Sequence, residues 1–126
     1  ISGMGTDGFT VYFYPDYLIG LYQRTPVQVN RAYLHMIFHC LFGHLKQPDH
    51  TDEQYWNLAC DIVVESIIDE LNEHSVRKYV PPYRKGVYQK LREKMEVLTP
   101  KGVYWELLGM HLEEEQFGKC RKNFCG

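Results

Sequence analysis

Apolar residues follow helical spacing over two long stretches of the chain. The first covers residues 26–45 and follows Thr25, which can cap a helix whose first residue is a proline. The second covers residues 52–74, with Thr51 or Asp52 as the cap. Because the first stretch is apolar on most of its circumference, the pattern predicts a long central helix, buried in the domain and packed against the second helix.

Weaker patterns predict the other elements. In chain order these are a turn over residues 3–8, a strand over 9–14, a short helix over 16–24, a charged peripheral helix over 85–97 and, after the cap pair Thr99-Pro100, a helix over 101–117 that ends at Gly118. The fold class is therefore α+β, mainly helical, with a small N-terminal strand region. We expect one domain over residues 1–118 and a C-terminal tail over 119–126, which fits the beginning of a truncated further region.

Composition and charge exclude several classes of partner. With 126 residues, 44% of them hydrophobic, the chain can bury one core without the help of disulfides. A net charge of -2 provides no basic field for nucleic acid or for an anionic membrane. No apolar run approaches a membrane span of roughly 20 residues, and the first residues lack the pattern of a signal peptide. We therefore expect a cytoplasmic protein.

The four cysteines do not form a metal-binding or disulfide pattern. Cys40 and Cys60 lie within apolar helical stretches, where free thiols pack as small hydrophobic groups. Cys120 and Cys125 are expected to be exposed, and their spacing is not that of a zinc knuckle. We interpret them as reduced thiols in a loose tail.

Histidines in the first long helix are the main candidates for chemistry. His35 and His39 are four residues apart, so both imidazoles project from one face and can reach one metal ion. His44 follows just past Gly43, in the position of a third ligand. Histidines in the middle of an apolar helix need partners, either a metal ion or hydrogen-bonding groups in the core. The spacing alone does not decide between these two interpretations.

The second long helix offers oxygen donors at helical spacing, Asn57, Asp61 and Glu65. Asp61 lies in apolar surroundings, where a carboxylate is costly to bury unless it is paired. It could bind a metal directly, hold an imidazole in the correct tautomer, or pair with an N–H group or an arginine of the core. Glu65 carries less information, because an exposed glutamate on a helix is ordinary.

Together these segments resemble the metallopeptidase domain found before von Willebrand A-like domains in bacterial proteins. The resemblance covers most of the chain and is carried by residues 5–8 with the tyrosine-rich strand and Pro15, by residues 35–44, and by residues 55–61. It implies a zincin-like fold, a Zn²⁺ cofactor, a hydrolase acting on peptide or protein substrates, a von Willebrand A-like domain in the same chain and an AAA-type ATPase as partner.

The family's motifs assign residues to roles. Its HExxH helix with a further histidine, and the tryptophan-asparagine-x-alanine-x-aspartate motif on the next helix, are matched here by His35, His39, His44 and Asp61. The resemblance therefore implies that these four residues bind the metal or support its ligands.

Two departures from the family pattern affect catalysis. Met36 replaces the glutamate of HExxH, which takes a proton from the metal-bound water, and a thioether cannot act as a base. Glu65 stands where the family usually has asparagine, so we hypothesise that it supplies the missing carboxylate. The resemblance thus predicts a zinc-dependent metallopeptidase or a catalytically impaired relative, a pseudoenzyme. The alternatives are a non-catalytic interaction module of a von Willebrand A/AAA ATPase assembly, or a helical protein with a fortuitous histidine pair.

Overall fold

The computed structural model describes residues 4–6, 10–43 and 46–124. Two short strands precede six helices, and the elements are β1 (Met4–Thr6), β2 (Val11–Phe13), α1 (Pro15–Arg24), α2 (Pro26–Leu41), α3 (Glu53–Glu70), α4 (Pro82–Arg92), α5 (Pro100–Gly109) and α6 (Glu114–Phe124). The prediction of a mainly helical α+β fold with a small N-terminal strand region is confirmed at this level.

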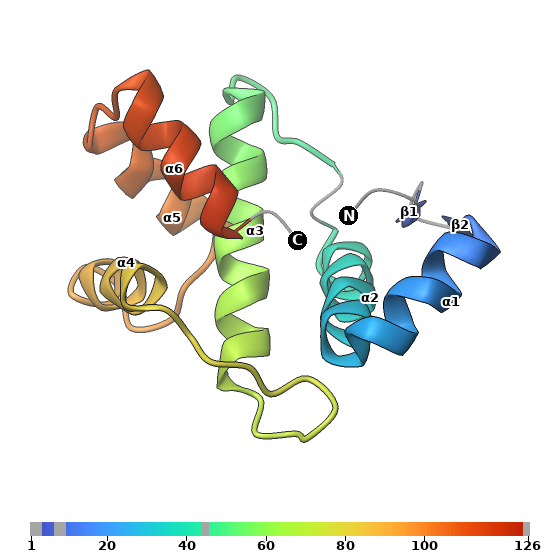
Figure 1. The fold of residues 1–126 in the computed structure, drawn as a ribbon. Helices are drawn as coiled ribbons and strands as arrows, with labels where there is room; N and C mark the ends of the chain where they lie inside the picture. The colour runs from blue at the N-terminus through green and yellow to red at the C-terminus, as the bar shows by residue number, and fades with distance from the viewer. Residues whose placement is uncertain (1–3, 7–9, 44–45, 125–126) are drawn as a thin grey trace.

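Helix α3 occupies the centre of the molecule. It stands between the hairpin with α1 and α2 on one side and α4, α5 and α6 on the other (Figure 1). Ten of its residues are buried, compared with four in α2. The prediction that the histidine helix is the buried central one was therefore wrong. The second half of α2 is open on one side, so that Leu41 is 70% exposed, whereas α3 is covered on both sides.

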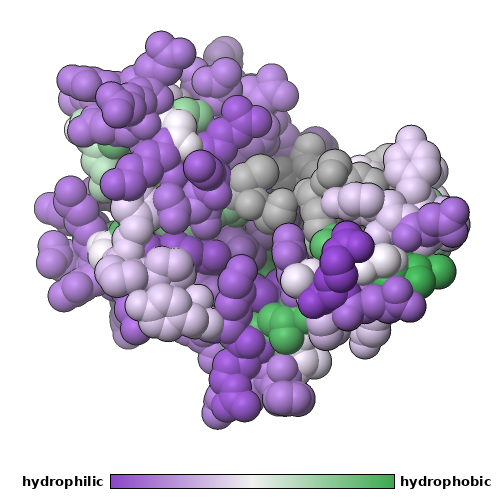
Figure 2. Space-filling view, viewed as in Figure 1, coloured by the Kyte–Doolittle hydropathy of each residue, from purple (hydrophilic) through white to green (hydrophobic). Residues whose placement is uncertain are grey.

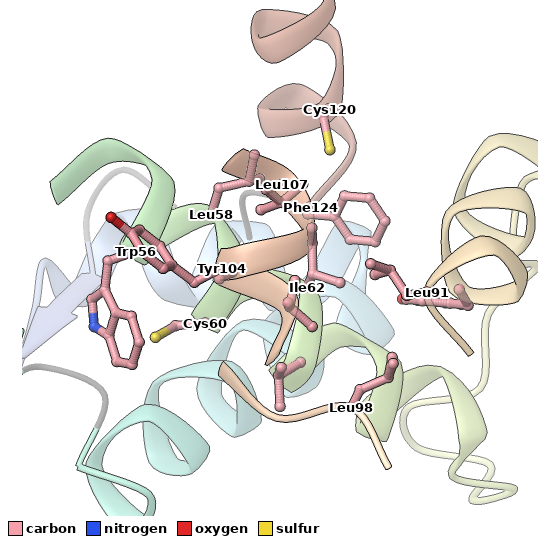
Figure 3. Close-up of a cluster of buried hydrophobic side chains, with 14 residues drawn as sticks. Trp56, Leu58, Cys60, Ile62, Leu91, Leu98, Tyr104, Leu107, Cys120 and Phe124 are labelled. Carbon is pink, nitrogen blue, oxygen red and sulfur yellow. The ribbon is translucent and has the colours of Figure 1, made fainter. Parts of the chain in front are cut away.

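The hydrophobic core lies between α3 and the three C-terminal helices (Figure 3). Leu58 and Ile62 of α3 meet Leu107 of α5 and Leu91 of α4, and all four are almost fully buried. The opposite side of α3 faces α2 and carries polar side chains. The apolar face therefore stabilises the domain, which leaves the other face of α3 available for a polar site.

Side-chain caps define the beginnings of α3 and α5. Asp52 accepts hydrogen bonds from the backbone N–H groups of Gln54 and Tyr55, as its position before the helix predicts. Thr99 caps α5 in the same way, through the N–H of Gly102. Thr25 differs, because its hydroxyl donates to the carbonyl of Leu21 in α1 rather than capping α2.

The N-terminal strand is one half of a hairpin. β1 and β2 pair antiparallel, with Gly5 opposite Tyr12. Residues 4–6 were predicted to be a turn, and this is corrected to a strand, because backbone pairing with β2 supplies hydrogen bonds that local turn propensity cannot indicate. Residues 7–9 lie outside the described part of the chain.

The C-terminal helices depart most from the predicted boundaries. α4 begins three residues earlier than predicted and ends five residues earlier. The single helix predicted over residues 101–117 is two helices, because His111 adopts a left-handed conformation with φ 49° after α5 ends. α6 then begins at Glu114, preceded by a hydrogen bond from the N–H of Glu113 to the side chain of Gln116, one half of a capping box.

The predicted loose tail is also corrected. α6 continues through Gly118 to Phe124, and the side chains of Cys120 and Phe124 are buried in the core (Figure 3). A helix of mostly polar composition with two buried positions gives a weak sequence pattern, which explains why it was missed. Cys125 lies outside the described residues.

The visible surface is mainly hydrophilic. On the face shown in Figure 2, hydrophobic side chains form only small, separate groups. Among the described residues, no helix combines the length and the apolar character that crossing a membrane requires.

We expect Phe124→Ala to lower the free energy of unfolding by about 3–5 kcal/mol, because it removes a fully buried ring from the core. Chemical denaturation followed by circular dichroism measures the change. Phe13→Ala is the matched control, since Phe13 is 52% exposed and its truncation should cost little. Equal losses in the two variants would contradict the placement of α6 in the core.

Candidate metal centre

Two polar stripes face each other across the interface between α2 and α3. Arg31, His35 and His39 are spaced four residues apart on α2, and Asp61, Glu65 and Asp69 have the same spacing on α3. The helices are antiparallel, because Arg31 pairs with Asp69, His35 with Glu65, and His39 with Asp61. Each basic side chain thus meets an acidic one inside the domain.

Three ligand-type atoms converge at one end of this interface. The Nε2 atoms of His35 and His39 are 2.8 Å apart, and each lies 2.9 Å from Oδ1 of Asp61. Side-chain exposure rises from 10% at His35 to 14% at His39 and 20% at Asp61. The group therefore opens toward solvent on the side of His39 and Asp61, while His35 is buried.

Hydrogen bonds alone do not satisfy this group well. If both Nε2 atoms carried protons, the two N–H groups would point at each other across 2.8 Å. If neither did, two nitrogen lone pairs would face a carboxylate oxygen. If only one of them did, it could donate to the other imidazole or to Asp61, but the lone pair of the second nitrogen would still face the carboxylate oxygen. A metal ion would take all three lone pairs at once.

The donor set fits a metal ion. Two imidazole nitrogens and one carboxylate oxygen are ligands that zinc and related divalent metals accept. In a tetrahedral zinc site such atoms stand about 3.3 Å apart, so the group needs to open by only a few tenths of an ångström. His35, His39 and Asp61 therefore form an arrangement that could hold a metal ion.

Glu65 binds the other nitrogen of His35. Its Oε2 lies 3.1 Å from Nδ1 of His35, so with His35 neutral the proton resides on Nδ1 and the lone pair of Nε2 points toward His39 and Asp61. A carboxylate that holds the remote nitrogen of an imidazole is a common support for metal-binding histidines. Glu65 thus orients His35 from behind and does not join the three converging atoms.

Two arginines balance most of the negative charge. Arg84, from α4, lies 3.0 Å from Glu65 and 2.9 Å from Asp69, and Arg31 forms ion pairs with the same two carboxylates. The partners of Asp61 among the described residues are the two histidines. Three carboxylates and two guanidinium groups leave one negative charge if both imidazoles are neutral. That charge favours a cation beside Asp61.

The pKa values reflect this arrangement. Burial alone would lower the pKa of His35, but hydrogen bonds and charge interactions with Asp61 and Glu65 outweigh it and raise that pKa to about 9. Burial would raise the pKa of both carboxyl groups, yet the histidines hold the pKa of Asp61 below its usual range. His35, with Arg84 and Arg31, does the same for the pKa of Glu65. A metal ion must therefore compete with a proton at His35.

The structure brings together three of the predicted ligands, His35, His39 and Asp61. His44 lies outside the described residues. Asn57 is exposed on α3 and is not one of the converging residues. Met36, at the position that the HExxH motif gives to glutamate, is half-buried.

Sequence reasoning missed the supporting residues Arg31, Asp69, Arg84 and Tyr88. Arg31 and Asp69 continue the two polar stripes by one further turn, so an extension of the four-residue spacing would have found them. Arg84 and Tyr88 belong to α4, and no local pattern connects them with α3. Tyr88 donates a hydrogen bond of 2.6 Å to Asp69.

Comparison of the chain with protein-family models, with curated proteins and with solved structures found no match in any of the three.

The free energy of unfolding of metal-free protein should depend on pH in a direction set by His35. The pKa of His35 is higher in the folded state, so its protonation stabilises the fold. This stabilisation is complete below pH 6.5, the pKa of the unfolded chain, and is lost as the pH rises to about 9. The lowered pKa values of Asp61 and Glu65 act oppositely, so their contribution is lost in acid. We expect a loss of about 1–3 kcal/mol from pH 6.5 to 9, measured by denaturation in a chelator.

His35→Gln should flatten this alkaline decline. His74→Gln is the control, because His74 is exposed and lies outside the interface between α2 and α3. A decline that persists unchanged in His35→Gln would show that another group is responsible.

Proposed function

We propose that this chain is a zinc-binding domain of the hydrolase type, a relative of the metallopeptidase domains that precede von Willebrand A-like domains. His35, His39 and Asp61 are the proposed ligands. The observation that carries the proposal is the convergence of three ligand atoms within 2.9 Å of one another on facing helices. The sequence motifs support the family relationship, and the acidic excess at the site supports a divalent cation.

The proposed reaction class is hydrolysis of peptide bonds. Zinc, when bound, supplies a Lewis acid that polarises a carbonyl group and lowers the pKa of water. The chain itself contributes the orientation of the ligands, because Glu65 holds Nδ1 of His35. It also leaves an approach for a substrate on the side where His39 and Asp61 are partly exposed.

Neither Met36 nor Glu65 is suited to act as the general base of hydrolysis. Met36 has no proton-accepting group, and both carboxylate oxygens of Glu65 already have partners, His35 on one and Arg84 on the other. These contacts support an orienting role for Glu65 in place of the base role hypothesised from the sequence. We therefore propose that hydrolysis is impaired in comparison with an HExxH enzyme, since a general base contributes about 10²- to 10⁴-fold.

The second candidate function is a non-catalytic interaction module in a von Willebrand A/AAA ATPase assembly. Two observations favour it, the thioether at position 36 and the commitment of Glu65 to structural contacts. In this case the metal ion would join α2 to α3 and stabilise a surface for binding another protein.

Metal content tests the site first. Protein purified without a chelator or a histidine tag should contain about one zinc per chain by elemental analysis. The double variant His35→Ala/His39→Ala should contain none, because it removes two of the three ligands.

The matched control removes two exposed histidines instead, as His50→Asn/His74→Ala. Asparagine is chosen at position 50 because the residue there has a positive φ of 63°. This control should keep its zinc. If wild-type protein binds no zinc even after zinc is added, the proposed function fails.

Restoring the base tests the reaction class. Zinc-loaded Met36→Glu should hydrolyse a quenched fluorescent peptide library about 10²- to 10⁴-fold faster than wild-type protein. Met36→Gln is the control, because glutamine has a similar shape and cannot accept the proton. Equal rates in the two variants, with zinc bound in both, would exclude the hydrolytic proposal and favour the interaction module.

A further inference from the structure

A chain of contacts leads from the proposed ligand His35 to helix α4. Glu65 uses its two carboxylate oxygens separately, with Oε2 3.1 Å from Nδ1 of His35 and Oε1 accepting a hydrogen bond of 3.0 Å from Nη2 of Arg84. Arg84 stands in the first turn of α4, a helix with no residue among the three converging ligands. The position of α4 is thereby connected to the orientation of an imidazole on α2.

Arg84 is the hydrogen-bond donor to Glu65 Oε1 within the described residues. Arg31 is the other nearby arginine, but its Nη2 lies 3.8 Å from the same oxygen, beyond hydrogen-bond range. Arg31 instead binds Asp69 and donates to the carbonyl of Val76. Both arginines are within ion-pair distance of Glu65, but only Arg84 donates a hydrogen bond to it among the described residues.

Two carboxylates of α3, those of Glu65 and Asp69, hold the guanidinium group of Arg84 in place. Its Nη2 also lies 2.9 Å from Asp69 and 3.3 Å from the hydroxyl of Tyr88. Cζ of the guanidinium group lies over the ring of Phe124, 5.1 Å from the ring centroid. Its buried Nε has no hydrogen-bond partner among the described residues, a cost that the contacts of Nη2 offset.

A buried carboxylate needs both of its partners to keep one orientation. Without Arg84, Oε1 of Glu65 would be left with Arg31 at 3.8 Å, and Glu65 could rotate away from His35 or take up a proton. In either case His35 would lose the acceptor that keeps the proton on Nδ1 and the lone pair of Nε2 directed at the metal.

We infer that Arg84 is a positioning residue of the metal centre, and that binding of a divalent cation between α2 and α3 is coupled to the packing of α4 against α3. This inference rests on the proposed zinc site and adds its regulation. Displacement of α4 lowers zinc affinity, and zinc binding in turn stabilises α4 against opening, because coupling between two sites is reciprocal. A partner that moves α4 would thus release the metal.

The test compares two arginines of the same helix. Arg84→Met removes the two ion pairs that Arg84 makes with Glu65 and Asp69 of α3. Arg92→Met also removes an ion pair from α4 to α3, but its partner is the exposed Glu70, which takes no part in the contacts of Glu65. Zinc affinity is measured by competition with a chromophoric chelator. We expect Arg84→Met to weaken zinc binding about tenfold, as loss of a supporting partner does, and Arg92→Met to leave it unchanged.

Arg84→Lys provides the rescue. All the polar contacts of Arg84 are made by the single nitrogen Nη2, so an ammonium group can take its place and should restore affinity. Nitrogen-15 chemical shifts of His35 in the zinc-bound protein supply a second measurement. They should report a proton on Nδ1 in wild-type protein and in Arg84→Lys, and a weakened Nδ1 hydrogen bond in Arg84→Met.

The outcomes separate this inference from the proposed function. If wild-type protein binds zinc and both methionine variants bind it equally well, the coupling is wrong and the zinc site stands. If wild-type protein binds no zinc, the site itself is wrong. Should Arg84→Met fail to fold, hydrogen exchange of wild-type protein decides, because zinc must then slow exchange in α4, and unchanged exchange there overturns the inference.

Discussion

The antiparallel contact between α2 and α3, in which three basic side chains meet three acidic ones, is the constraint on which the site depends. Buried charges are tolerated only when each has a partner, and removal of one partner from such a pair costs about 3–5 kcal/mol. Arg31, His35 and His39 therefore contribute to how α2 lies on α3, because each has to meet its acidic partner. The same pairing places two imidazoles and one carboxylate within reach of a single cation.

The two faces of α3 make different kinds of contact. Its apolar face packs against α4, α5 and α6 and supplies the core, whereas its polar face holds Asp61, Glu65 and Asp69 against α2. Because the core lies on the other side, the polar face can carry one negative charge more than Arg31 and Arg84 balance when both imidazoles are neutral. A proton on His35, whose pKa Asp61 and Glu65 raise, or a metal ion could supply the missing positive charge, and the two would compete for the same nitrogen.

Glu65 illustrates why a residue's chemical type does not settle its role. In the sequence, Glu65 is a carboxylate that faces a helix with Met36 in place of the glutamate of an HExxH motif, so a catalytic role is the natural hypothesis. In the fold, one oxygen faces His35 and the other receives a hydrogen bond from Arg84. A carboxylate held at both oxygens is suited to orienting an imidazole and is poorly suited to moving a proton, since proton transfer requires a free lone pair near the substrate.

The sequence by itself determined the local features of this protein. Helical spacing identified both long helices and put His35 and His39 on one face, and cap chemistry located the beginnings of α3 and α5. Only the tertiary structure decided that α3 is central, that Phe124 belongs to the core, and that Arg84 reaches Glu65. The physical reason is the distance along the chain over which each kind of interaction acts. Periodicity and capping act within a few residues, whereas burial and ion pairing depend on segments that are distant in sequence and meet only in the folded chain.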